Sequence, residues 1–175
     1  MLNRIFIRGR LFGLEHTVLG SAILGLLLLW TLLAAGAWYL LDQPPVSAAL
    51  LGLAAALLHF GGEVWHQYGH ARAARRAGAP MIAVRYWLVL GSSIYPEDEP
   101  EQQPKVHIRR ALGGPLASLS LAAVLAGLLL AFAPGTPVFY LTAFACLDNL
   151  LVFGLGSFLP LGFTDGSTIL RYARN

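Results

Sequence analysis

His66 and His70 stand four residues apart in the stretch EVWHQYGHARAARR, at positions 63–76 of this 175-residue chain. On an α-helix, residues at i and i+4 project from successive turns toward one point, so a single helix can supply two imidazole ligands to a zinc ion. Gln67 follows the first histidine, where a hydrolytic zinc site needs a glutamate base. The stretch therefore predicts a zinc centre that lacks its usual proton acceptor.

A polar stripe extends this site along the same predicted helix. His59, Glu63, His66 and His70 fall within about 60° of one another over roughly 16 Å of helix. Ionisable groups at membrane depth each cost about 2.5 to 3.5 kcal/mol, so several on one face call for a metal, water or a polar partner helix. Hydrogen bonds between helices are the alternative, and for a lone histidine we would favour them.

A catalytic zinc ion keeps three protein ligands and one open position, so the two histidines need a third ligand from elsewhere. Asp165 is the candidate. It follows the last apolar segment in SFLPLGFTDGSTIL, where proline and glycine would end the helix and turn the carboxylate inward. That end lies on the same side of the membrane as the end of the second apolar segment. We therefore expect the three side chains to meet.

The elements that must position these residues are membrane spans. The chain is 57% hydrophobic and 12% charged, whereas ordinary soluble domains are about 25% charged. Four apolar segments are long enough for a bilayer core, which takes about 20 helical residues. They are residues 17–41, 46–71, 111–133 and 138–161. The predicted fold class is an all-α integral membrane protein with about four transmembrane helices, built as one membrane-embedded domain over residues 1–175.

The basic residues indicate how these spans are oriented. None of the twelve lysines and arginines falls in the short loops 42–45 and 134–137. The positive-inside rule then predicts that both termini are cytoplasmic. The net charge of +3 therefore reflects topology, and we expect no nucleic-acid partner. The expected location is the inner or plasma membrane of a prokaryotic cell. A cleaved signal peptide is the competing interpretation, but the first apolar run is about twice a signal core.

The longest connection, residues 81–108, lies between the second and third spans. Its first part, MIAVRYWLVLGSSIYP, is rich in β-branched and aromatic residues. Such a composition predicts a short β-strand or hairpin at the cytoplasmic membrane surface. The following EDEPEQQPK is acidic and proline-rich, which predicts a flexible loop.

Three motifs resemble, in the same order, those of the site-2 protease family of intramembrane zinc metalloproteases. The family's HExxH corresponds to HQYGH at 66–70, its GPxxN to GPLAS at 114–118, and its NLLPxxPLDGG to SFLPLGFTDGS at 157–167. The resemblance runs from about residue 50 to the C-terminus. It implies that His66, His70 and Asp165 are zinc ligands and that residues 81–95 form a sheet beside the substrate.

The motifs depart from the family pattern at four positions. Gln67 replaces the glutamate, Ser118 and Ser157 replace two asparagines, and Thr164 replaces a leucine. The serines keep their hydrogen-bonding capacity, so the resemblance implies that Ser118 and Ser157 bind the substrate backbone. Gln67 cannot act as a base, and general acid–base help is worth about 10² to 10⁴ in rate. The site is therefore predicted to be inactive or weak.

Three explanations of Gln67 remain open. It is an engineered Glu-to-Gln change, it marks a natural pseudoprotease, or Glu63 has taken over as the base one turn earlier. The third explanation requires the Glu63 carboxylate to reach about 6 Å further along the helix axis. The competing role of Glu63 is a hydrogen bond to His59 inside the bundle.

The resemblance implies hydrolysis of a peptide bond in or near a transmembrane helix of a protein substrate within the lipid bilayer, impaired by Gln67. A second hypothesis is a non-catalytic zinc-binding pseudoprotease that binds transmembrane segments without cutting them. A third is metal or proton transport along the polar stripe. A transporter would be expected to contain internal repeats, and the sequence shows none.

Overall fold

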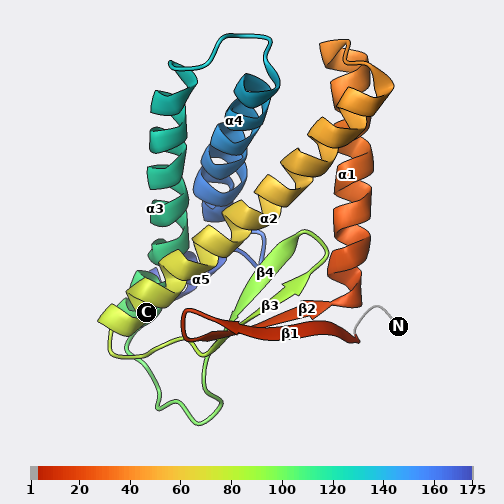
Figure 1. Ribbon diagram of the computed structural model, residues 1–175. Helices are drawn as coiled ribbons and strands as arrows, with labels where there is room; N and C mark the ends of the chain where they lie inside the picture. Colours follow the sequence, from red (N-terminus) through yellow and green to blue (C-terminus); the bar gives the residue numbers. More distant parts are fainter. Residues whose placement is uncertain (1–3, 175) are drawn as a thin grey trace.

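The structure, a computed structural model, describes residues 4–174. Within these residues, four helices are long and apolar enough to cross a membrane, and they stand on a small sheet at one end (Figure 1). The first three are α1 (Gly20–Leu41), α2 (Pro45–Arg76) and α3 (Pro104–Leu129). The fourth spans Pro137–Phe158. The predicted class of a four-span integral membrane protein with a small β element is therefore confirmed.

Prolines mark where three of these helices begin. Pro45, Pro104 and Pro137 each occupy the first turn, where the missing amide hydrogen costs nothing and the fixed φ suits the helix. Asp42 ends α1 in the left-handed conformation, with φ 49°. α2 has 32 residues, and it continues beyond the predicted apolar segment. It therefore carries the polar stripe and a basic C-terminal turn on one continuous element.

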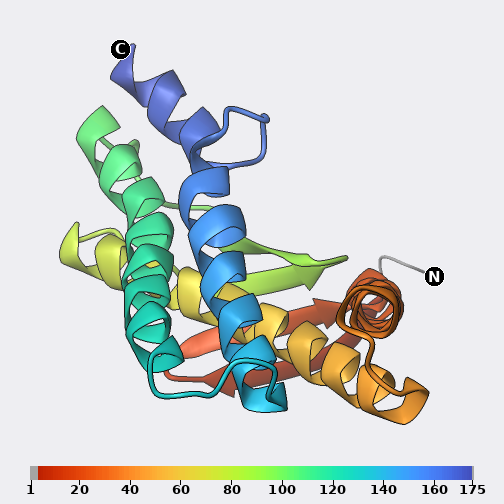
Figure 2. The same ribbon diagram turned by 90° about the horizontal axis from the view of Figure 1, so that it is seen from above.

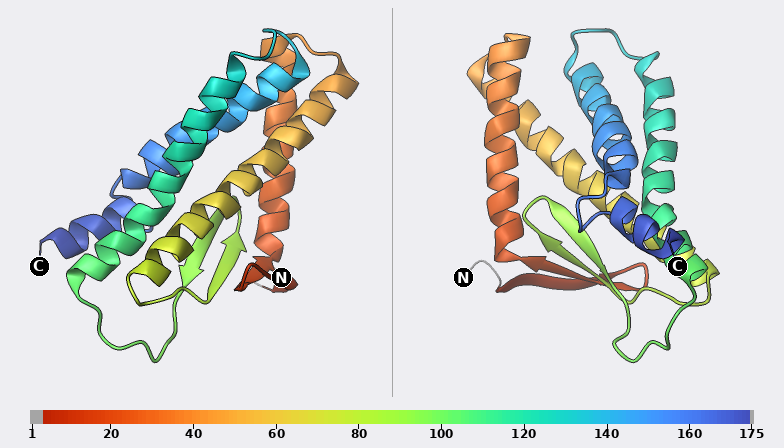
Figure 3. Two further views of the ribbon diagram at one scale, coloured as in Figure 1. Left: turned by 60° about the vertical axis from the view of Figure 1, so that its left-hand side comes forward. Right: turned by 180° about the vertical axis from the view of Figure 1, so that it is seen from behind.

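The fourth span changes its helical type halfway. α4 (Pro137–Leu147) is followed without a break by the π-helix η1 (Asp148–Leu155) and the short 3₁₀ helix η2 (Gly156–Phe158). π-helical turns are rare and are found frequently at functional sites. Here the π-helical segment packs against α3 and α2. A turn then leads to α5 (Asp165–Ala173), which lies beside the foot of α3 in the rear view (Figure 3).

The sheet has four strands in the order β1-β2-β3-β4. The strands are β1 (Ile5–Leu11), β2 (Leu14–Leu19), β3 (Ala83–Trp87) and β4 (Leu90–Ile94). β1 and β2 form one antiparallel hairpin and β3 and β4 another, and β2 pairs with β3 in parallel. The hairpin in residues 81–95 was predicted. The β1–β2 hairpin was not, and residues 17–19, which we assigned to the first span, belong to β2.

α2 is the central element of the bundle. Seen from above, it runs obliquely under α3 and α4, and α1 is viewed almost end-on beside its other half (Figure 2). Side chains from β2, the start of α1, the C-terminal part of α2, and β3 with the segment before it form the largest buried apolar cluster. Its members are Leu14, Ala22, Ala71, Ala74, Met81, Val84 and Tyr86. The sheet is therefore fixed beneath the half of α2 that carries the histidines.

α2 and α3 approach each other at two glycines. A Cβ atom added to Gly69 would overlap the carbonyl of Gly113, and a Cβ atom added to Gly113 would overlap the carbonyl of Gly69. Small residues at such crossings allow two membrane helices to bring their backbones together. The crossing places the backbone of α3 directly beside His66 and His70.

Candidate metal centre

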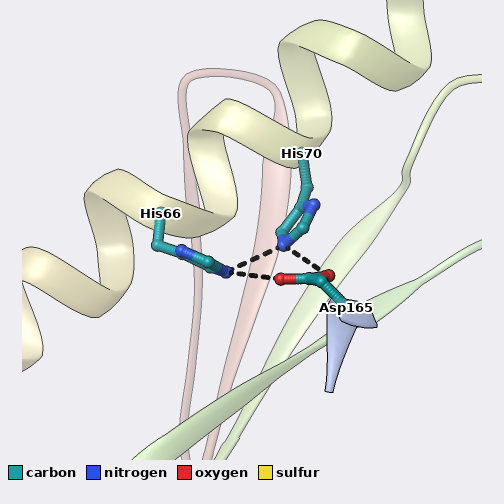
Figure 4. Close-up of side chains that lie close together, drawn as sticks. All are labelled: His66, His70 and Asp165. Atoms are coloured by element: carbon teal, nitrogen blue, oxygen red, sulfur yellow. Dashed lines mark hydrogen bonds and ion pairs between the residues drawn. The ribbon is translucent and has the colours of Figure 1, made fainter. Parts of the chain in front are cut away.

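His66, His70 and Asp165 converge, although Asp165 lies 95 positions beyond His70 in the sequence. Their ligand atoms all lie within 4.8 Å of one another. The Asp165 carboxylate oxygens lie 3.3 Å from His66 Nε2 and 3.3 Å from His70 Nε2, and the two Nε2 atoms are 2.9 Å apart. Figure 4 shows both rings on successive turns of α2, pointing at the carboxylate at the start of α5.

Each histidine uses its other ring nitrogen to contact α3. His70 Nδ1 lies 2.8 Å from the carbonyl oxygen of Arg110, and His66 Nδ1 lies 3.1 Å from Ser118 Oγ. A carbonyl can only accept, so His70 Nδ1 carries the proton and His70 Nε2 presents a lone pair to the centre. Protein partners that fix the tautomer and ring orientation in this way accompany most metal-binding histidines.

The space at the centre suits a metal ion. A Cβ atom at Gly114 would fall against the Nε2 atoms of both His66 and His70, so only glycine in α3 leaves this space open. Two imidazole nitrogens and a carboxylate oxygen are a donor set that zinc accepts in catalytic sites. Electron-rich atoms this close together also need a cation or a proton between them. The residues present therefore fit a zinc ion.

Asp165 is held in place by the turn before α5. Gly166 passes so close to the backbone of Phe158 that a Cβ atom would overlap the carbonyl. The Thr164 hydroxyl accepts from Leu161 N at 3.3 Å and donates to the carbonyl of Leu159, so the threonine that replaces the family's leucine stabilises the turn. Burial alone would raise the pKa of the Asp165 carboxyl, but its contacts with the two histidines lower that pKa below its ordinary value.

Gln67 is buried beside the centre, and both ends of its amide are bonded within the protein. Gln67 Nε2 donates to Glu63 Oε1 at 2.8 Å, and Gln67 Oε1 accepts from Ser93 Oγ at 2.8 Å. Glu63 Oε1 also accepts from the backbone amide of Gly91 at 2.9 Å. Glu63 and Gln67 therefore connect α2 to strand β4.

The expected hydrogen bond between Glu63 and His59 is wrong. His59 Nδ1 lies 3.1 Å from each carboxylate oxygen of Asp148 in the π-helix. His59 Nε2 lies 2.9 Å from the carbonyl oxygen of Val89, in the turn of the β3–β4 hairpin. The helical stripe predicted that both residues face inward, but it could not tell which of them would meet the fourth span.

A cavity of about 580 Å³ opens beside the candidate ligands. Glu63, Gln67 and Ser157 line it together with strand β4, whose outer edge faces the cavity. Its apolar walls come from β3 and from the fourth span and the turn after it. They are Trp87, Val152, Phe153, Leu159, Leu161 and Phe163. An extended chain beside β4 would thus have polar groups on one side and apolar walls on the other.

The two serines of the altered motifs occupy different surroundings. Ser157 lines the cavity, and its hydroxyl donates to Gly154 O at 2.8 Å. Ser118 is 0% exposed and contacts His66. Substrate binding by Ser118 and Ser157 stays a prediction. The contact between Ser118 Oγ and His66 Nδ1 orients the imidazole ring of His66.

Arg110 and Gly114 are site residues that the sequence analysis missed. The buried Arg110 side chain donates to Ala79 O at 3.0 Å and to Glu99 Oε2 at 2.9 Å. It also stacks on the Tyr95 ring at 4.0 Å. The sequence did contain a signal for Arg110, which is an arginine at the polar end of an apolar helix. A charged side chain at the start of a membrane span is rarely buried without a specific partner.

Comparison with known proteins adds relatives at the level of sequence and of fold. No protein-family model matches the chain. It is 30% identical over 166 residues to "Putative zinc metalloprotease Rip3" of Mycobacterium tuberculosis, in strains Erdman and H37Rv; the match covers 93% of this chain and 42% of the relative. The chain thus spans less than half the length of these curated relatives.

A solved structure, the Site-2 Protease from Methanocaldococcus jannaschii, has the same fold. The two align with a TM-score of 0.66 and 18% sequence identity, over 96% of this chain and 71% of that one. The sequence match covers nearly all of this chain, including the histidines, and the fold match covers the helices and the sheet around them. These two matches support the predicted resemblance to the site-2 protease family, and the structural match shows that the chain has the same fold.

Proposed function

We propose that the chain is an intramembrane peptidase that binds one zinc ion through His66, His70 and Asp165 and is impaired by Gln67. Its substrate is a peptide bond in or beside a transmembrane helix of another protein. The observation that carries this proposal is the convergence of the three ligand atoms within 4.8 Å. The position is an inner or plasma membrane of a prokaryotic cell, with the sheet and both termini on the cytoplasmic side.

A bound zinc ion would supply Lewis acidity, polarising the scissile carbonyl and lowering the pKa of a water molecule to about 7. The chain's own residues orient the reactants. Ser118 and the Arg110 carbonyl hold the two imidazole rings. Apolar side chains line the cavity beside strand β4, and the outer edge of β4 is available to hold an extended peptide backbone.

Proton transfer is the step that Gln67 weakens, because an amide cannot accept a proton at neutral pH. Apart from Asp165, Glu63 is the only carboxylate among the described residues lining the cavity. We infer that Glu63 and Gln67 form a matched pair, in which one negative charge has moved one turn along α2. The Gln67 amide donates to the Glu63 carboxylate, so the pair holds a single charge without repulsion.

The second candidate function is binding of transmembrane segments without cleavage. The observation that favours it is that both polar atoms of the Gln67 side chain are hydrogen-bonded within the protein. The nitrogen donates to Glu63, and the oxygen accepts from Ser93. These bonds hold both polar atoms of the amide in place at the position where the family has its base. A chain of this kind would hold a substrate helix beside the zinc ion and release it intact.

Zinc content tests the site first. The full chain in lipid nanodiscs should hold one equivalent of zinc, and His66→Ala and Asp165→Ala should each lose it. Asp98→Ala is the matched control, because Asp98 is an exposed carboxylate in the acidic loop and should keep the metal. Retention of zinc by Asp165→Ala would refute the proposed ligand set.

Cleavage of a model transmembrane segment then separates the two functions. The peptidase proposal expects slow, chelator-sensitive hydrolysis by the unaltered chain. The binding proposal expects photocrosslinking of the segment to β4 with no product after prolonged incubation. Zinc binding without crosslinking or cleavage would refute both functions and leave the metal site intact.

A further inference from the structure

The β1–β2 hairpin carries apolar side chains that the rest of the described chain leaves largely exposed, although the Phe12 ring meets the edge of the Tyr68 ring at 5.6 Å between centroids. Every residue of β1 is exposed. Ile7 is 53% exposed, Leu11 is 49% exposed, and Phe12 at the turn is 79% exposed. Three such side chains on a short two-stranded ribbon form a continuous apolar surface, and surfaces of this kind mark contacts with proteins or membranes.

The strand register shows which way this surface faces. Ile7 lies opposite Val18 and Leu11 lies opposite Leu14, and side chains of directly paired residues project from the same face of a sheet. Leu14 is buried and Val18 packs against the cluster beneath α2. Ile7 and Leu11 therefore project toward the side on which the helices stand, beyond the area that α2 covers.

The opposite face of the hairpin is charged. Arg8 lies opposite Thr17 and Arg10 lies opposite Glu15, and Arg8 Nε is 3.1 Å from Glu15 Oε1. From Ile7 to Leu11 the strand therefore alternates between an apolar side and a basic side, whereas the exposed Ile5 and Phe6 come before this part, where the strand register is irregular. Such alternation is expected where one face of a strand meets an apolar phase and the other meets water.

The position of the hairpin relative to the spans identifies the apolar phase. α1 begins at Gly20, directly after the last residue of β2. Figure 1 shows β1 and β2 running from the foot of α1 beneath the helices, with β1 on the outside. A ribbon that extends sideways from the end of a membrane span, with its apolar face turned toward the side of the spans, faces the lipid where no helix covers it.

We propose that the β1–β2 hairpin is a membrane-surface anchor whose apolar side chains Ile7, Leu11 and Phe12 enter the leaflet at the sheet end of the bundle. Arg8 and Arg10 remain in the aqueous layer, where long basic side chains can reach lipid phosphates at the rim of the strand. This anchor does not depend on the proposed peptidase activity.

Anchoring would fix the depth of the whole sheet. β2 pairs with β3 from Glu15↔Ala83 to Val18↔Tyr86, and β3 pairs in turn with β4. Ser93 of β4 is bonded to Gln67 beside the candidate metal centre. A hairpin held in the leaflet therefore sets the height of the β4 edge relative to the lipid.

A second copy of the chain is the competing occupant, because the outer edge of β1 has unpaired backbone groups. Two copies paired in antiparallel fashion through β1 would bring Arg8 and Arg10 of one chain close to those of the other. Like charges directly opposite each other on paired strands are destabilising. The charge pattern therefore favours lipid over a second copy.

Spin labels at single cysteines test the anchor. The background is the full chain with Cys146→Ala in nanodiscs containing anionic lipid. Ile7→Cys and Leu11→Cys place the nitroxide on the apolar side, and Arg8→Cys and Arg10→Cys serve as matched controls one residue away. Collision rates with oxygen, which enters lipid, and with a water-soluble nickel chelate are measured for each label.

The expected result is a reversal between neighbouring positions. Oxygen should exceed the nickel chelate at positions 7 and 11, and the chelate should exceed oxygen at 8 and 10. Equal accessibility to the chelate at all four positions would overturn the proposal. Protection at 7 and 11 that comes with spin–spin broadening, and disappears on dilution with unlabelled chain, would assign the face to a second copy instead.

Discussion

Changing Gln67 to Glu is the obvious way to restore a base, and the structure predicts that this change alone falls short. Gln67 Nε2 lies 2.8 Å from Glu63 Oε1. A carboxylate at both positions would bring two negative charges to about that separation. With an effective dielectric constant of about 20, the repulsion is about 6 kcal/mol. Two carboxylates in such contact share one proton and keep it to a higher pH than either would alone, as in paired-aspartate sites.

The exchange Glu63→Gln with Gln67→Glu avoids this repulsion. The amide at 63 can donate to the carboxylate at 67; because Gln67 Nε2 and Gly91 N both contact the one oxygen Glu63 Oε1, the amide gives up the bond from Gly91 N when it does so. Ser93 can still donate to position 67. The double variant therefore keeps the bond between the two side chains, the bond from Ser93 and the single charge, and places that charge where the base is needed.

The assay is single-turnover cleavage of a model transmembrane segment, with zinc content measured in parallel. We expect the double variant to exceed the unaltered chain by about 10² to 10⁴, the usual worth of a general base. Gln67→Glu alone should lie between them and should gain activity as the pH rises and removes the shared proton. Glu63→Gln alone is the control for the loss of a charge.

Equal activity of the single and double variants at every pH would refute the shared-proton argument. Hydrolysis by the unaltered chain that disappears in Glu63→Gln, with zinc retained, would make Glu63 the base. Hydrolysis by the unaltered chain that persists in Glu63→Gln would remove Glu63 from the reaction.

Three further predictions follow from contacts around the centre. Gly114→Ala should abolish zinc binding because its Cβ atom would fill the metal position, whereas Gly127→Ala, where a Cβ atom meets nothing within 4 Å, should retain it; metal analysis checks both. Ser118→Ala should weaken zinc affinity about 10- to 100-fold, the usual effect of losing a histidine's outer partner, as measured by chelator competition. The hydrogen bond from Arg110 lowers the pKa of Glu99, so the ion pair should persist at neutral pH and be lost only as the pH falls through that lowered value. Hydrogen exchange of the acidic loop should rise there, and in the variant Glu99→Gln this pH dependence should be absent.

The parts of the centre that could be predicted depend on local spacing. His66 and His70 are four residues apart on one helix, so their convergence follows from helical geometry alone. Asp165 could be assigned because proline and glycine end the fourth span on the side where the second span ends. The ligand atoms do lie together, and the role of the three residues as zinc ligands stays a prediction.

The parts that could not be predicted depend on contacts between elements. The motif predicted that Ser118 binds substrate. The way α3 packs against α2 decides instead that the Ser118 hydroxyl contacts His66. The hydrogen-bond partner of His59 is Asp148, which lies in the π-helix. No periodicity in the sequence predicts a π-helix there. The β1–β2 hairpin was missed because its strands are short and the second runs directly into the apolar pattern of α1.

The π-helical stretch from Asp148 to Leu155 has a consequence for how this site tolerates changes in chain length. Each residue added to or removed from a helix turns everything downstream by roughly 100° and shifts it by about 1.5 Å along the axis. Loss of one residue from α4 would therefore rotate Asp165 away from the two imidazoles, whereas loss of one residue from this wider coil would be absorbed as it tightens to an ordinary helix. The phase of the fourth span, more than its composition, is thus what keeps the third ligand aimed at the centre.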